Sequence, residues 1–84
     1  MDREELNSKL LEAAEKGDTD KIWELIEQGA KINTQDENGR TALMRSAWYG
    51  HLTLELLETF MKKGANVNAL TNDGNTVLMH AASR

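Results

Sequence analysis

Residues 39–47 read Gly-Arg-Thr-Ala-Leu-Met-Arg-Ser-Ala, and residues 74–82 read Gly-Asn-Thr-Val-Leu-Met-His-Ala-Ala. Gly, Thr, Leu, Met and the last Ala of the first stretch each recur 35 residues later in the second. The pair Gly29-Ala30 also recurs 35 residues on, as Gly64-Ala65. Self-similarity at such a period is typical of an array of stacked repeats, in which each unit buries its apolar face against its neighbours.

An earlier and shorter copy precedes these two. Residues 8–14, Ser-Lys-Leu-Leu-Glu-Ala-Ala, match residues 41–47 at an offset of 33. Each copy opens with a hydroxyl residue, Ser8 or Thr41, that can cap a helix N-terminus. A glycine follows each copy, Gly17 or Gly50, and can end the helix in a left-handed conformation. Each copy therefore predicts a helix that ends at a glycine.

A second helix is predicted in each unit, from Asp20 to Gln28 and from about Thr53 to Lys63. Between the units the chain is polar, and these segments end in Asn38-Gly39 and Asp73-Gly74. Asn-Gly and Asp-Gly pairs favour hairpin turns because they tolerate positive φ. The expected unit is a helix, a turn, a second helix and a hairpin-like loop.

These elements resemble the ankyrin repeat family. Its motif runs Asp-x-x-Gly-x-Thr-Pro-Leu-His-x-Ala-Ala-x-x-Gly-His, followed by an apolar helix and Gly-Ala-Asp-Val-Asn. The matching positions in this chain are Asp36, Gly39, Thr41, Leu43, Ala47, Gly50-His51, Gly64-Ala65 and Val67-Asn68. The resemblance covers nearly the whole chain.

The resemblance implies an all-α fold, an ankyrin-repeat solenoid of helix-turn-helix units joined by β-hairpin-like loops. About two and a half repeats are expected from the length. Residues 1–35 would form an N-terminal capping repeat, residues 36–70 a full repeat with a two-residue insertion, and residues 71–84 an incomplete third repeat.

The insertion lies between Gly50 and Gly64, which are 14 positions apart, whereas Gly17 and Gly29 are 12 apart. Two extra residues would rotate a helix by roughly 200° at 100° per residue. They could lengthen the second helix or be absorbed as a bulge or a longer turn. We expect a longer helix with local adjustment at its start or end.

The second helix of the middle unit has apolar residues at helical spacing. Leu54, Leu57 and Met61 form an i, i+3, i+7 stripe, with Leu56 and Phe60 beside it. This stripe is the face that we expect the helix to bury.

The two ends of the chain differ in polarity. Lys21 and Glu24 are polar where an internal repeat would be apolar, as expected of a capping repeat that faces water. The last unit stops midway through its motif, which would leave Val77, Leu78 and Met79 partly uncovered. Either the chain is the N-terminal fragment of a longer multidomain ankyrin protein, or the open C-terminal face pairs with another copy in a homo-oligomer.

The composition argues against several classes of function. The formal net charge is −4 with a pI of about 5.1, which disfavours binding to a nucleic-acid backbone. The chain has no cysteine and therefore no disulfide framework. No membrane span is expected, because the longest apolar stretches are only a few residues. No signal peptide is expected, because the N-terminal residues lack a basic start and an apolar stretch. A cytoplasmic location is the expectation.

No catalytic set is evident. The two histidines, His51 and His80, lie in different units without zinc-ligand spacing. A structural hydrogen-bonding role is expected for His51, and helix packing is expected for Ser46 rather than a nucleophilic role. We therefore expect no enzyme activity, no cofactor and no metal site.

The resemblance implies a protein–protein interaction scaffold that binds a folded partner through its hairpin tips and inner helices. The sharpest candidate is Trp48-Tyr49, because adjacent surface aromatics are typical of binding hot spots. Packing over a neighbouring unit is the alternative for Trp48, and Trp23 is expected to cover its own local surface. The predicted partner-binding residues are Glu37, Asn38, Arg40, Trp48, Tyr49, Asn72, Asp73 and Asn75.

Overall fold

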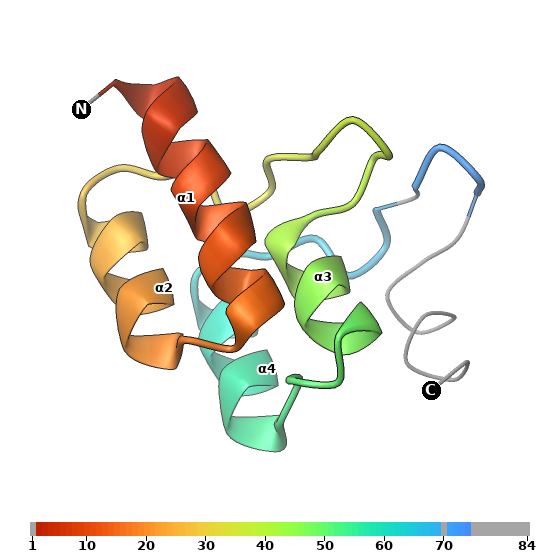
Figure 1. The fold of residues 1–84 in the computed structure, drawn as a ribbon. Coiled ribbons are helices and arrows are strands. Elements are labelled where there is room, and N and C mark those ends of the chain that lie inside the picture. The colour runs from red at the N-terminus through yellow and green to blue at the C-terminus, as the bar shows by residue number, and fades with distance from the viewer. Residues whose placement is uncertain (1, 70, 75–84) are drawn as a thin grey trace.

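The computed structural model describes residues 2–69 and 71–74 and contains four helices in that part of the chain (Figure 1). They are α1 (Arg3–Lys16), α2 (Thr19–Glu27), α3 (Ala42–Trp48) and α4 (Leu54–Lys62). These described segments contain no strand. The helices form two helix-turn-helix units, α1–α2 and α3–α4, and each unit is followed by an extended loop (Figure 1). The all-α repeat architecture expected from the sequence is confirmed.

A polar side chain caps the N-terminus of each helix by accepting a hydrogen bond from a backbone N–H three residues later. The caps are Asp2, Asp18, Thr41 and Thr53. The prediction for Thr41 is confirmed. The prediction that Ser8 caps the first helix is wrong, because α1 begins at Arg3 and Ser8 lies inside it. The helix extends further back because Asp2 caps it and Leu6 adds a buried residue one turn before Leu10.

Small residues let α1 and α3 pack closely together. Ala14 and Ser46 are both fully buried, and they belong to the matching small pairs of the two units, Ala13-Ala14 and Ser46-Ala47. The Ser46 hydroxyl donates to the Ala42 carbonyl at 3.1 Å and lies 3.4 Å from the Ala14 carbonyl of the preceding unit. Ser46 is therefore a packing residue with its polar group satisfied, as expected.

The two-residue insertion does not lengthen the second helix. Helices α2 and α4 both have nine residues, so the expectation of a longer helix is wrong. At their C-terminal ends the same hydrogen bond recurs 35 residues apart, from Ala30 N to the Leu25 carbonyl and from Ala65 N to the Phe60 carbonyl.

The ends of α1 and α3 instead match at an offset of 33. Asp18 N donates to the Ala13 carbonyl, and His51 N donates to the Ser46 carbonyl. The offset therefore changes from 33 to 35 after His51, within the link between α3 and α4. The insertion is a longer turn.

The buried face of α4 also differs from the expected stripe. Leu56 and Phe60 are buried at 2% and 0% exposure, whereas Leu54 and Met61 are 72% and 50% exposed. Both stripes fit the helical period, so periodicity alone does not select the buried one. Leu56 and Phe60 belong to one buried cluster with Ile22 and Leu25 of α2, so the neighbouring unit decides which face is covered.

A comparison of α2 with α4 also confirms the polarity expected of the first unit. Lys21 and Glu24 of α2 are exposed, whereas Leu56 and Thr59, which lie 35 residues later in α4, are buried. These α4 positions are covered in the described structure, whereas no described residue covers their counterparts in α2.

Candidate functional site

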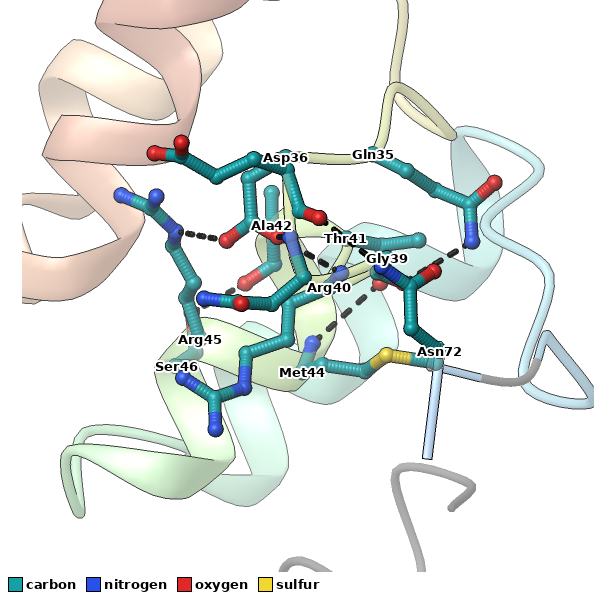
Figure 2. A network of polar contacts seen from close by, with 12 residues as sticks. Gln35, Asp36, Gly39, Arg40, Thr41, Ala42, Met44, Arg45, Ser46 and Asn72 are labelled. Carbon is teal, nitrogen blue, oxygen red and sulfur yellow. Dashed lines mark hydrogen bonds and ion pairs between the residues drawn. The ribbon is translucent and has the colours of Figure 1, made fainter. Parts of the chain in front are cut away.

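The loop before α3 is a tight turn built around Asp36. Its backbone N–H donates to the Arg40 carbonyl at 2.9 Å, and its carbonyl accepts from Gly39 N at 2.9 Å. Its carboxylate oxygen Oδ1 accepts from Asn38 N and Arg40 N at 2.8 and 2.9 Å (Figure 2). Only Gly39 has positive φ, at 81°. The loop is therefore hairpin-like, and its Asn-Gly pair uses positive φ at the glycine alone.

The second carboxylate oxygen of Asp36 joins this loop to α3. Oδ2 accepts from Arg45 Nε at 2.9 Å, and the Asp36 side chain is 7% exposed. Burial alone would raise the pKa of Asp36, but the hydrogen bonds from Arg40 N, the Arg45 side chain and Asn38 N outweigh it and lower the pKa. Asp36 therefore stays ionised and holds the loop against the helix.

Arg40 projects from the same loop toward the end of α3. Its guanidinium carbon lies 4.8 Å from the centre of the Trp48 ring, a cation–π contact. Trp48 is half-buried, and Tyr49 beside it is 42% exposed. The loop and the C-terminal end of α3 thus combine to present one arginine and two aromatic rings.

Tyr49 also contacts the first unit. Its hydroxyl is hydrogen-bonded to Glu15 of α1, and this bond raises the pKa of Tyr49. Glu15 was not predicted as part of the site. The two residues are 34 positions apart, and no local sequence signal connects them.

Neighbouring loops stack on one another through Asn72. Its backbone N–H donates to the Asn38 carbonyl at 2.9 Å, and its side-chain Nδ2 donates to the Glu37 carbonyl at 2.8 Å. A side chain at Gly39 would collide with this contact, because a Cβ there would lie 2.7 Å from Asn72 N (Figure 2). The amide of Asn72 is thus already bonded to the neighbouring loop.

Asn33 makes a similar link between the starts of the two loops. Its Oδ1 accepts from Asn66 N at 2.7 Å, and its Nδ2 donates to the Gly64 carbonyl at 3.1 Å. Backbone bonding by asparagine therefore fixes the spacing of the two loops at two levels.

The predicted site residues fall into three groups. Arg40, Trp48 and Tyr49 lie together. Glu37, Asn38, Asn72 and Asp73 lie at exposed positions of the loop tips, and Asn75 lies outside the described residues. Nothing in the structure tests their binding to a partner, so that role stays a prediction.

His51 and Trp23 have local contacts of different kinds. Among the described residues the His51 ring forms no hydrogen bond, so the expected hydrogen-bonding role is not found for its side chain. The ring lies over Gly17, where a Cβ would be 2.6 Å from His51 Cγ. Trp23 is half-buried and carries Lys63 Nζ 4.5 Å above its ring, which fits the expected local cover.

Two kinds of feature, metal sites and membrane spans, are absent from the described residues. No group of three or more histidine or acidic side chains lies close enough to bind a metal in this part of the chain. No helix there is both long and apolar enough to cross a membrane.

Comparison with known proteins identifies the repeat. The family signature described as ankyrin repeats in three copies matches residues 10–84. An ankyrin repeat-containing protein of Schizosaccharomyces pombe is 35% identical over 66 residues, which cover 79% of this chain and 31% of that protein. The E3 ubiquitin-protein ligase XBAT33 of Arabidopsis thaliana is 35% identical over 78 residues, covering 93% of this chain and 15% of the ligase.

A small bacterial protein is matched over most of its own length. A putative ankyrin repeat protein of Rickettsia felis is 39% identical over 54 residues, covering 64% of this chain and 86% of that protein. In contrast, the chain spans under a third of the fission yeast protein and about a seventh of the Arabidopsis ligase. Together with the stacked helical units and the bonded loops, these matches show that the chain belongs to the ankyrin repeat family.

Proposed function

We propose that the chain is a non-catalytic scaffold that binds a folded protein partner through its hairpin tips and inner helix surface. Ankyrin repeats are generally protein–protein interaction modules. The observation that carries the proposal for this chain is the cluster of Arg40, Trp48 and Tyr49, which offers two aromatic rings and a stacked arginine at the surface. These three residue types are enriched in interface hot spots and in interface cores.

The loop tips support the same surface. Bonds from Asn72 to Glu37 and Asn38 fix the two tips relative to each other, and Asp36 fixes the first tip to α3. A rigid surface loses little conformational entropy on binding, so its contacts contribute more of their energy to affinity. Glu37 and Asp73 then provide a polar rim beside the aromatic pair.

The test is affinity capture with the chain and two variants. Trp48→Ala combined with Tyr49→Ala is expected to weaken partner binding at least about tenfold, because hot-spot truncations cost about 2 kcal/mol or more. Trp23→Ala is the matched control, since it removes the other tryptophan, on α2, and leaves the proposed surface intact. Bound proteins are identified by mass spectrometry, and their affinities are then measured with purified partners.

Circular dichroism accompanies each variant. The double variant is expected to keep the helical signal of the unmodified chain. Equal affinity of the double variant and of Trp23→Ala for the partner would contradict the proposed surface. Loss of the helical signal in the double variant would instead show that the aromatic pair belongs to the core.

Self-association is a second candidate. The C-terminal face expected to pair, with Val77, Leu78 and Met79, lies outside the described residues, and one observation favours a different surface. Leu54 and Met61 lie seven residues apart on the same side of α4 and are 72% and 50% exposed, which leaves an apolar surface for another copy to cover. Light scattering at increasing concentration tests it. A mass that stays monomeric, or a dimer that persists in Leu54→Glu with Met61→Glu, would rule out this surface.

A further inference from the structure

Arg40 of the proposed surface and the nearby Arg45 have different partners. Arg45 donates from Nε to Asp36 at 2.9 Å, and this ion pair joins the loop to α3. Arg40 has no such partner: within residues 2–69 and 71–74, its guanidinium forms no ion pair or side-chain hydrogen bond and lies over the Trp48 ring. The backbone N–H of Arg40 is bonded to Asp36, so its main chain is fixed. The part of the chain that the structure describes thus offers no carboxylate to this positioned cation.

The contact with Trp48 positions the guanidinium of Arg40 over the ring. A guanidinium that lies on an aromatic face keeps its N–H donors at its edge, in the plane of the group. Those donors match the two oxygens of a carboxylate in a bidentate arrangement. Tyr49, which is 42% exposed, adds an apolar ring that follows Trp48 directly in the chain.

The charges around Arg40 favour an anion of single charge. Glu37 lies in the same loop, Glu15 is bonded to Tyr49, and Asp73 lies in the neighbouring loop. The chain carries a net charge of −4. A phosphate of nearly two negative charges would be repelled by these carboxylates, whereas one carboxylate is neutralised by one arginine.

We infer that Arg40, stacked on Trp48, binds a carboxylate of the partner protein, from an Asp or Glu side chain next to an apolar residue that packs on Tyr49. This inference rests on the proposed function and names the chemistry of the partner. Arg40 supplies the specific polar contact, and the aromatic pair supplies the buried apolar area.

The test uses a displayed library of a small folded scaffold with a randomised surface. It is selected on the unmodified chain and counter-selected on the Trp48→Ala, Tyr49→Ala variant. Each acidic residue of a selected binder is then changed to its amide and measured against the unmodified chain and Arg40→Gln. One acid-to-amide change is expected to weaken binding to the unmodified chain about tenfold, the size of a charge-assisted hydrogen bond.

The same change is expected to have little effect on binding to Arg40→Gln, because a double-mutant cycle isolates the coupled pair. Arg3→Gln is the matched control, with the same substitution at the start of α1, and should bind like the unmodified chain. Arg40→Lys keeps the charge without the planar fork and is expected to recover only part of the affinity. Circular dichroism of each variant confirms that the fold is kept.

Three results are distinguishable. An acidic residue coupled to Arg40 supports the inference. Binders that depend on Trp48 and Tyr49 but have no acidic residue coupled to Arg40 overturn the inference and leave the proposed function standing. Failure to obtain any binder that depends on the aromatic pair overturns both.

Discussion

The two helix-turn-helix units connect their helices by turns of different length. In the first unit Asp18 has two roles: its backbone N–H donates to the Ala13 carbonyl, and its side chain caps α2. In the second unit these roles are divided, because His51 N donates to the Ser46 carbonyl while Thr53 caps α4. The two extra residues separate the end of one helix from the start of the next and leave the length of the second helix unchanged, at nine residues in α2 and in α4.

This difference shows where a repeat tolerates an insertion. Within α4, two added residues would rotate the buried positions Leu56 and Phe60 away from the first unit by roughly 200°. Within the turn, the cost is only the ordering of two more loop residues, because loop-closure entropy grows slowly with length. The register of α4 therefore matches that of α2 at the C-terminal end. There Ala65 N donates to the Phe60 carbonyl, as Ala30 N donates to the Leu25 carbonyl.

The largest expected effect tests which face of α4 the first unit covers. Phe60→Ala should destabilise the fold by about 3–5 kcal/mol, because the ring is fully buried and its loss leaves a cavity. Leu54→Ala, on the same helix at 72% exposure, should change stability by about 0.5 kcal/mol or less. Urea denaturation followed by circular dichroism measures both. A similar cost for the two variants would contradict the register of α4.

The loop glycines give the second comparison. Gly39 and Gly64 have nearly the same positive φ, 81° and 86°, so alanine pays a similar left-handed strain of about 1–2 kcal/mol at each. Only at Gly39 would the new Cβ meet Asn72 and the backbone of Thr71; nothing lies within 4 Å at Gly64. Gly39→Ala should therefore cost about 1–3 kcal/mol more, as overpacking does. Equal midpoints in urea would show that the loops are not held together at this level.

The third comparison is between two neighbouring carboxylates of the loop before α3, the buried Asp36 and the exposed Glu37. Asp36→Asn should cost about 1–3 kcal/mol, because it weakens charge-assisted bonds to two backbone N–H groups and to Arg45. Glu37→Gln, which neutralises the exposed carboxylate of the same loop, is the control and should cost about 0.5 kcal/mol or less. Chemical denaturation at pH 7 measures both variants.

The pH dependence of stability checks the same carboxylate. The pKa of Asp36 is lowered in the folded chain, so its contribution is fully present above the unfolded pKa of about 3.9 and is lost as the pH falls through the folded pKa. The unmodified chain should therefore lose stability more steeply than Asp36→Asn below about pH 5. Parallel curves in this range would show that Asp36 gains nothing from its ionised form.

Local signals in the sequence predicted the helices and their ends well. Thr41 caps α3, and Gly17 ends α1 with a φ of 73°, as its repeat position suggested. The polar Lys21 and Glu24 correctly marked the face of α2 that stays exposed. Each of these features depends on residues within one turn of the position concerned.

Apart from the start of α1, where Asp2 and not Ser8 is the cap, the errors concern contacts between units. The choice between two apolar stripes on α4 depends on where α2 lies, and the placement of the insertion depends on the same packing. The bond between Tyr49 and Glu15 and the stacking of Asn72 on Asn38 join positions about 34 residues apart. The sequence brought Arg40, Trp48 and Tyr49 together as candidates, but it did not show that Asp36 binds Arg45 and leaves Arg40 without a carboxylate.

The smallest expected effect tests the longer turn itself. Replacing His51, Leu52 and Thr53 with a single aspartate would give the second unit the link found in the first, with one residue bonding to the end of α3 and capping α4. The variant should stay folded and lose about 1 kcal/mol or less, because half-buried Leu52 loses its packing while the shorter loop costs less entropy to close. Leu52→Ala isolates the packing part. A shortened chain that no longer unfolds cooperatively would show that the turn does more than connect two helices whose positions are set elsewhere.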